Sequence, residues 1–151
     1  EAARAAAAAR GSGNVSFEVA DARDLPAFAD GSFDAVLLAD FVEHVTDEVL
    51  VPCLAEARRL LVPGGALALY TPNLDHWAER IKAGVPGLQQ EDHIAVRPSA
   101  EVVRLVSASG FAVDDLYFSA SPYPLLGAVD RLFPGAALCR FRTVLRALRP
   151  S

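Results

Sequence analysis

Two carboxylates that follow predicted β-strands are the residues best placed to bind a ligand. Asp21 directly follows residues 15–20, in which apolar residues alternate with polar ones and predict a short strand. Asp40 follows the apolar run Phe33–Ala39, which is typical of a strand buried on both faces of a parallel sheet. Because ligands of open α/β sheets bind outside the carboxyl ends of the strands, both carboxylates are candidate ligand contacts. Two other interpretations stay open: Asp21 caps a turn by binding its own backbone two residues on, and Asp40 caps a helix.

Strands and helices alternate along the chain and predict an α/β fold, a mostly parallel sheet with helices on both faces. Apolar patterns predict further strands over residues 66–70, 111–118 and 141–148, and helices over residues 1–10, 47–61 and 100–109. The turn Pro63-Gly64-Gly65 is expected to end the second helix. A polar loop with a short helix is expected over residues 74–97, and a short helical cap or crossover over residues 119–137.

Composition narrows the class of protein. Of the 151 residues, 52% are hydrophobic, which is enough for one globular core. A net charge of −5 argues against nucleic acid as a partner. No run of about 18 apolar residues and no signal peptide are found, so we expect no membrane span and a cytoplasmic location. Cys53 and Cys139 have no Cys or His partners at metal-ligand spacing, so we predict no metal site and a buried thiol at Cys53.

Five short segments carry a pattern that is specific when they are taken together. They are Phe17-Glu-Val-Ala-Asp-Ala-Arg-Asp-Leu-Pro26, Asp30-Gly-Ser-Phe-Asp34, Val42-Glu-His-Val45, Glu56-Ala-Arg-Arg-Leu-Leu-Val-Pro-Gly-Gly65 and Thr71-Pro-Asn73. In this order and spacing the chain resembles the class I S-adenosylmethionine-dependent methyltransferases, particularly their small-molecule group. The resemblance covers about residues 15–118 and implies a Rossmann-like sheet.

The resemblance implies S-adenosylmethionine as the cofactor and assigns residues to it. Asp21 would accept the exocyclic amino group of adenine, and the N–H of Ala22 would donate to a ring nitrogen. The turn formed by Ala39 and Asp40 would lie against the methionine end of the cofactor, available to its ammonium and ribose. This turn lacks the Asn/Asp-Pro-Pro-Tyr pattern of nucleic-acid amino-methylating enzymes, so a small-molecule acceptor is the expected partner.

The implied reaction is an in-line displacement at a methyl group that the sulfonium already activates. Alignment of acceptor and methyl group can supply about 7–11 kcal/mol of the barrier. Where the acceptor is a hydroxyl or a carbon acid, a general base adds about 10²–10⁴-fold. His44, at the mouth of the site, and His93, in the insertion, are the candidate catalytic bases, with His76 a weaker one. In the alternative interpretation His44 packs at a helix end and His93 lies on a surface loop.

The family's first two strands and its glycine-rich loop have no counterpart, because Gly11-Ser12-Gly13 follows a predicted helix and not a buried strand. In the family's sheet these strands lie between the predicted strand at 15–20 and Phe33–Ala39. We therefore expect an N-terminally truncated domain, in keeping with the absence of Met, whose gap is filled by a missing N-terminal segment or a partner chain.

The expected organisation is one partial methyltransferase domain over residues 1–151. It comprises a helix remnant (1–13), a cofactor-side core (14–72), an insertion over the site (73–98) and a C-terminal helix, strands and cap (99–151). A function from another class stays open, namely a non-catalytic methyltransferase-like interaction module.

Overall fold

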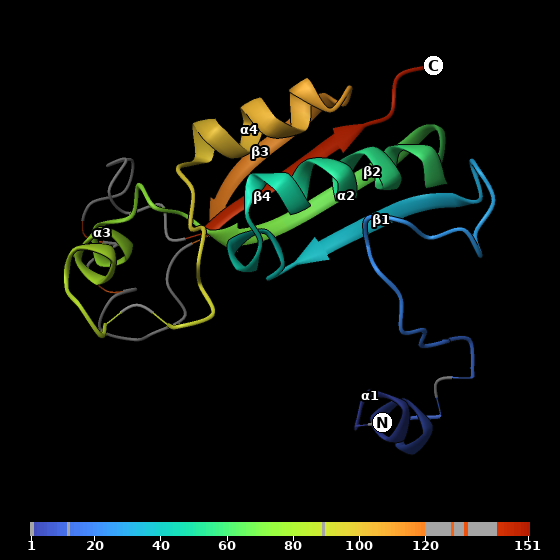
Figure 1. Cartoon of the computed structure of the whole chain (residues 1–151), viewed down its shortest axis with the longest axis horizontal. Helices are drawn as coiled ribbons and strands as arrows, with labels where there is room; N and C mark the ends of the chain where they lie inside the picture. Colours follow the sequence, from blue (N-terminus) through green and yellow to red (C-terminus); the bar gives the residue numbers. More distant parts are fainter. Residues whose placement is uncertain (1, 12, 89, 120–127, 129–131, 133–141) are drawn as a thin grey trace.

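A four-stranded mixed sheet forms the body of the chain. The computed structural model describes residues 2–11, 13–88, 90–119, 128, 132 and 142–151. The strand order is β1 (Phe33–Ala39), β2 (Leu61–Pro72), β4 (Arg142–Leu148) and β3 (Ala112–Ser119) (Figure 1). β1 and β2 are parallel, whereas β4 is antiparallel to both of its neighbours. The α/β class is as predicted, but the expected mostly parallel sheet is corrected to a mixed one, because β4 runs against the other strands.

Two helices, α2 (Asp47–Leu60) and α4 (Ser99–Ala108), cover one face of this sheet (Figure 1). The alternate residues of β2 and β4 that point toward them are buried, and with the apolar faces of both helices they form one core. In the described part of the chain the helices packed on the sheet lie on this face alone, not on both as predicted. Right-handed crossovers explain why: β1 to β2 and β2 to β3 advance across the sheet in the same direction, so both helices fall on the same side.

No loop separates α2 from β2, whereas a turn was predicted between them. Leu61 is already extended (φ −73°, ψ 142°), so β2 starts directly after the helix. The Pro63-Gly64-Gly65 turn therefore lies inside β2 and does not end the helix. A Cβ on Gly65 would lie 2.8 Å from the carbonyl oxygen of Val62 and 3.2 Å from that of Asp34. Only glycine fits at this irregularity between β1 and β2.

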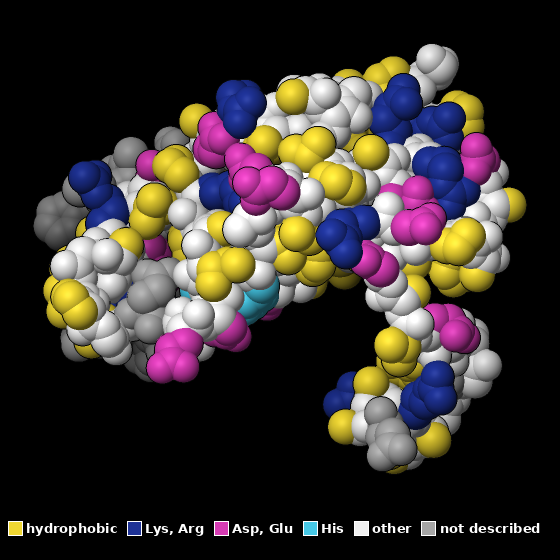
Figure 2. Space-filling view, in the orientation of Figure 1, with side chains coloured by type: hydrophobic (Ala, Val, Ile, Leu, Met, Phe, Trp, Pro, Cys, Tyr) yellow, Lys and Arg dark blue, Asp and Glu magenta, His cyan; other side chains and the backbone are white. Residues whose placement is uncertain are grey.

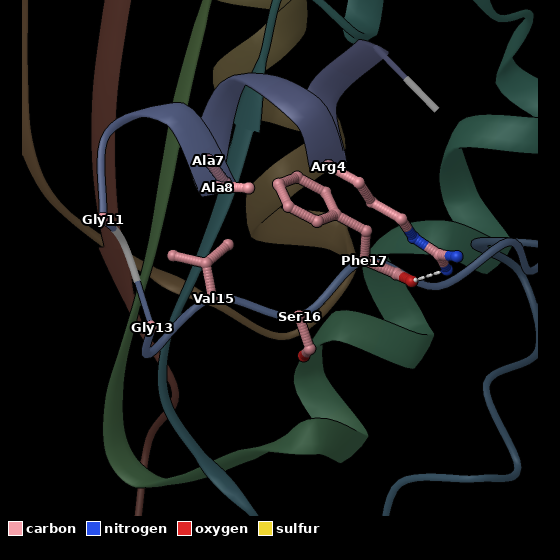
Figure 3. A pocket seen from close by; sticks show the side chains of 8 residues that line it. All are labelled: Arg4, Ala7, Ala8, Gly11, Gly13, Val15, Ser16 and Phe17. Carbon is pink, nitrogen blue, oxygen red and sulfur yellow. Dashed lines mark hydrogen bonds between the residues drawn. The ribbon is translucent and has the colours of Figure 1, made fainter.

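The strand predicted over residues 15–20 is not formed, and Val19 is fully exposed. A strand needs a neighbour to bond its backbone, and none of the described strands lies beside this segment. Figure 1 shows it, with α1 (Ala2–Ala9), apart from the sheet. It lies against α1, and the two enclose a shallow pocket in which the guanidinium of Arg4 donates to the carbonyl of Phe17 (Figure 3).

β1 is consequently an edge strand. Phe33–Ala39 was predicted to be buried on both faces, yet the side chain of Leu37 is 68% exposed and most of the strand is open. The prediction is wrong because burial on both faces needs a further strand and a second layer of helices. Neither is found among the residues that the structure describes.

The remaining elements follow the predictions closely. The short turn η1 (Val42–His44) connects β1 to α2, and the insertion holds one short helix, α3 (Trp77–Gly84). Cys53 is buried in α2. Cys139 and most of the predicted cap over residues 119–137 lie outside the described residues.

An ion-pair network ties the loop before β1 to the end of α2. The carboxylate of Glu56 accepts from the backbone N–H of Leu25 (2.8 Å) and from the guanidinium of Arg59 (2.7 and 2.9 Å). Arg59 in turn donates to the carbonyls of Leu25 and Phe28. The hydrogen bonds from Arg59, and then that from Leu25, lower the pKa of Glu56 to about 2.

The Glu56 carboxylate is therefore expected to stabilise the fold above the usual pKa of a glutamate, with its contribution lost as the pH falls toward 2. Glu56→Gln should lower the free energy of unfolding at pH 7 by about 1.5 kcal/mol or more, the value of a charge-assisted hydrogen bond. The difference from the parent chain should shrink between pH 5 and pH 2, measured by urea denaturation. Asp34→Asn, which removes an exposed carboxylate from β1, is the control and should change little. An equal loss at pH 2 and pH 7 would contradict this account.

The open edge of β1 gives a second expectation. An exposed apolar edge strand can pair with a second chain, and a charged residue on the edge opposes such pairing. Leu37→Lys should shift the chain toward a monomer in light scattering over a concentration series. Val51→Lys adds the same charge at an exposed position of α2 and should leave association as it is. If both variants behave alike, net charge and not the strand edge controls association.

Candidate functional site

The polar residues gather where β1 and β2 end. Asp40, directly after β1, has a positive φ of 46°, and its N–H donates to the carbonyl of Tyr70 (2.9 Å). Its carboxylate pairs with the guanidinium of Arg142, the first residue of β4, which lies beside Pro72 in the sheet. Arg142 also lies 4.7 Å from the centre of the Tyr70 ring, a cation–π arrangement. Asp40 is thus held in this strained backbone conformation by one contact to β2 and one to β4.

η1 brings a buried carboxylate to the same edge. Glu43 is 1% exposed, and its Oε2 accepts from the hydroxyl of Thr71 (2.9 Å) near the end of β2. Its Oε1 is also buried and has no hydrogen-bond partner among the described residues. A buried carboxylate with one oxygen unsatisfied is costly, so this group is a candidate for a ligand contact.

The two predicted histidines meet at this site. The rings of His44 and His93 are 4.9 Å apart between centroids and nearly perpendicular (76°). Nδ1 of His44 lies 2.8 Å from the carbonyl oxygen of Asp92. Because a carbonyl oxygen only accepts, Nδ1 is the donor, and in the neutral tautomer the lone pair is on Nε2. Both histidines are half-buried. Figure 2 shows histidine side chains reaching the surface beside acidic ones.

Arg97 fixes the position of η1. Its buried guanidinium donates to the carbonyls of Val42 (2.6 Å), Val45 (2.8 Å) and Ala95 (2.9 Å) and pairs with Asp47 (2.7 Å). These partners lie on both sides of Glu43 and His44 and in the insertion. One side chain therefore joins η1, the start of α2 and the insertion.

His76, the weaker candidate, has a structural position. It is buried, and its Nδ1 accepts from the N–H of Ala78, so it caps the N-terminus of α3. Asn73, at the end of the Thr-Pro-Asn motif, is also buried and accepts from the N–H of Asp75. Both residues shape the insertion that carries His93.

Asp21 and Ala22 lie in a turn of their own. Oδ1 of Asp21 accepts from the backbone N–H of Arg23 (3.0 Å), the turn-capping contact that the sequence left open. The guanidinium of Arg23 also pairs with this carboxylate (2.6 Å) and, with the backbone bond, lowers the pKa of Asp21 to about 2. Within the described residues no hydrogen bond or ion pair joins Asp21 or Ala22 to Ala39 or Asp40. The structure brings His44 and His93 together beside Glu43, pairs Asp40 with Arg142 at the end of β1, and leaves the Asp21 turn separate.

Glu43, Thr71 and Arg142 are site residues that the sequence analysis did not single out. Glu43 stands directly before His44, and Thr71 lies in the quoted Thr-Pro-Asn motif, so adjacency to predicted motifs was the available signal. Arg142 belongs to the alternating pattern of the predicted strand over residues 141–148, and this pattern predicts an exposed surface residue, not a site residue.

The comparisons with known proteins relate the N-terminal part of this chain to one family. Residues 1–69 match the family model described as "Methyltransferase domain". The match spans less than half of the chain, and over those residues the chain is similar to a methyltransferase domain of the S-adenosylmethionine-dependent class. No curated protein matches the chain.

Solved structures agree on the fold. A methyltransferase from Methanosarcina mazei described as SAM-dependent superimposes with a TM-score of 0.68 at 18% identity, over 98% of this chain and 76% of its own. The [4+2]-cyclase SpnF gives 0.69 at 21% identity, over 98% of this chain and 61% of its own. A complex of a Haloferax volcanii methyltransferase activator, Trm112, with a methyltransferase gives 0.65 at 21%, over 95% of this chain and 66% of that chain. The chain thus spans less than two thirds of the length of the latter two.

The described part of the chain contains no helix long and apolar enough to cross a membrane.

The buried guanidinium of Arg97 should be essential to this arrangement. Arg97→Ala leaves three backbone carbonyls and Asp47 without their donor and should cost about 3–5 kcal/mol of unfolding free energy in chemical denaturation. Arg104→Ala, which breaks the exposed pair with Glu101, is the matched control and should cost less than about 1 kcal/mol. Similar losses for the two variants would show that the Arg97 contacts do not hold the site.

Proposed function

We propose that this chain forms the adenine- and acceptor-side part of an S-adenosylmethionine-dependent methyltransferase that acts on a small molecule. The proposal is carried by polar residues at the carboxyl edge of the sheet: Asp40 directly follows β1, and the cluster of Glu43, His44 and His93 is joined to the end of β2 through Thr71. β1 and most of β2 lie within the residues that match the methyltransferase family model. This edge is where open α/β sheets bind ligands.

The residues present suit the cofactor's charges. Asp21 is ionised at neutral pH, so its carboxylate can accept from the amino group of adenine once it shares or releases Arg23. Ala22 would donate its N–H to the same ring. Asp40 and the carbonyl of Ala39 would accept from the ammonium and ribose of the methionine end. Supply of an activated methyl group is the cofactor's part of the chemistry.

For methyl transfer to an oxygen or carbon acid, the acceptor must lose a proton as its new bond to the methyl carbon forms and the carbon–sulfur bond breaks. His44 has the suitable tautomer, because Nδ1 donates to Asp92 and Nε2 can accept the acceptor's proton. His93, in contact with the His44 ring, is the second candidate base. Trp77 and the rest of the insertion would exclude water above the acceptor.

A non-catalytic interaction module is the alternative. It is favoured by the Haloferax structure, in which a matching methyltransferase chain is held by an activator protein, and by the open edge of β1. The SpnF match also shows that this fold is found in a protein described by another chemistry. Substitution of both Asp21 and Asp40 by Asn should abolish methyl transfer in an enzyme but leave partner binding intact in a module.

The proposal is tested by titrating S-adenosylhomocysteine into the isotope-labelled chain and following backbone amides by NMR. We expect a dissociation constant weaker than about millimolar, since no described residue supplies the glycine-rich turn or the ribose-binding acid. Shifts should concentrate at Ala22 and Asp40. Asp21→Asn should reduce the Ala22 shift about tenfold at fixed ligand, the value of one charge-assisted hydrogen bond.

Asp34→Asn is the control for that titration, since it removes a carboxylate from the opposite end of β1. Shifts confined to the pocket between α1 and residues 13–17 would contradict the proposed placement. Micromolar binding would contradict the view that the glycine-rich half is required.

A further inference from the structure

A buried carboxylate and two imidazoles form a cluster whose donor set suits a metal ion. Glu43, His44 and His93 each offer one ligand atom, and these atoms lie within 4.8 Å of one another. We propose that the three residues bind a divalent transition-metal ion of the zinc class. The sequence analysis predicted no metal site because the two cysteines have no partners at metal-ligand spacing. His93 is far from Glu43 and His44 along the chain, and the insertion brings it back to them.

The donor types select the class of ion. Two imidazole nitrogens and one carboxylate oxygen suit Zn²⁺ and its neighbours, whereas Mg²⁺ and Ca²⁺ prefer oxygen ligands alone. Three protein ligands leave at least one coordination position open. The site is therefore of the open kind, which can hold water or an oxygen of a small molecule.

The buried carboxylate is the independent observation that points to a cation. Glu43 is 1% exposed, and its Oε1 has no hydrogen-bond partner in the described part of the chain. A carboxylate in this position is stabilised by a nearby positive charge more than by any neutral neighbour. Its backbone is fixed as well, since its carbonyl accepts from the N–H of Ala95 (3.0 Å).

Outer contacts orient two of the ligands. Metal-binding histidines usually donate their other ring N–H to a carbonyl or carboxylate. His44 does so: its Nδ1 lies 2.8 Å from the carbonyl oxygen of Asp92 and 3.6 Å from the Asp92 carboxylate. The Thr71 hydroxyl similarly holds one oxygen of Glu43. Because Nδ1 is engaged by Asp92, Nε2 would be the atom of His44 that binds the ion.

Binding requires a small contraction. Ligand atoms around a tetrahedral zinc ion lie about 3.3 Å apart, given metal–ligand distances near 2.0–2.1 Å. The cluster must therefore close by about an ångström or more, which the half-buried histidines can do by side-chain rotation. His93 belongs to the insertion and Glu43 to η1, so the ion would also tie these two segments together.

This inference goes beyond methyl transfer and holds whether or not the chain is catalytic. If the chain is a methyltransferase, an ion at this site would bind the acceptor oxygen and lower its pKa. A nitrogen that binds the ion cannot accept a proton at the same time. Metal binding and the general-base role of the same histidine are therefore mutually exclusive in one molecule.

Calorimetric titration of Zn²⁺ into the full chain, freed of any polyhistidine tag and of chelators, tests the site. One equivalent should bind and raise the thermal midpoint. His93→Ala and His44→Ala should each weaken zinc binding at least about tenfold. Substitution of residues that only orient a metal ligand already lowers affinity by about that factor, so removal of a ligand should lower it at least as much. Glu91→Gln removes an exposed carboxylate from the same loop and should leave affinity within about twofold.

Co²⁺ absorption gives a second readout, since the visible bands report the ligand set directly. Glu43→Gln should change those bands; because Glu43 is buried, circular dichroism must first show that the variant folds, and His93→Ala decides if it does not. Zinc binding that survives both histidine substitutions, falls equally with Glu91→Gln, or fails to occur would overturn the proposal.

Discussion

The hydrogen bonds of Arg97 are the interaction on which the candidate site depends. η1 is three residues long and cannot hold its conformation alone, since short 3₁₀ turns have poor internal hydrogen bonds. Arg97 binds the carbonyls of Val42 and Val45, which flank Glu43 and His44. A guanidinium has a planar fork of donors, so it fixes directions as well as distances. Glu43 and His44 are therefore placed by a residue that binds the backbone on either side of them.

Chain direction explains both why α2 and α4 lie on one face of the sheet and why the N-terminal segment is separate from it. From β1 to β3 the chain moves one way across the sheet, and right-handed crossovers place α2 and α4 on one side. Helices on the other face would require further strands on the far side of β1, so that the chain crosses the sheet in the opposite direction. The segment 15–20 would belong to that half, and among the described residues no strand lies beside it to pair with its backbone. The same missing layer leaves Leu37 exposed.

Sequence patterns correctly predicted the elements that are stabilised by their own residues or by burial of a single face. The predicted helix over residues 47–61 is found as Asp47–Leu60. Its apolar face and the charged residues at its two ends all lie within this segment, so the sequence of the segment alone predicts it. The prediction of a strand over residues 15–20 was wrong because a strand forms only beside another strand, and the sequence of the segment does not show whether one is present. The two histidines could be nominated from residue type, but their contact depends on the path of the insertion. Arg142 was missed because its alternation with Thr143 indicates an exposed strand face, whereas its position as first residue brings it to Asp40.

The ion pair at the edge of the sheet bears on how Asp40 would serve the proposed function. Arg142 binds Oδ1 of Asp40, so the pair is close to neutral and would attract an isolated ammonium only weakly. An amino acid carries both charges. Its ammonium can take the second oxygen of Asp40 while its carboxylate approaches Arg142, so each charge meets its opposite. The left-handed backbone of Asp40 costs roughly 1 kcal/mol, which its bonds to Tyr70 and Arg142 offset before any ligand arrives. The pair is thus oriented in advance for a zwitterion, which is the charge pattern of the methionine end of S-adenosylmethionine.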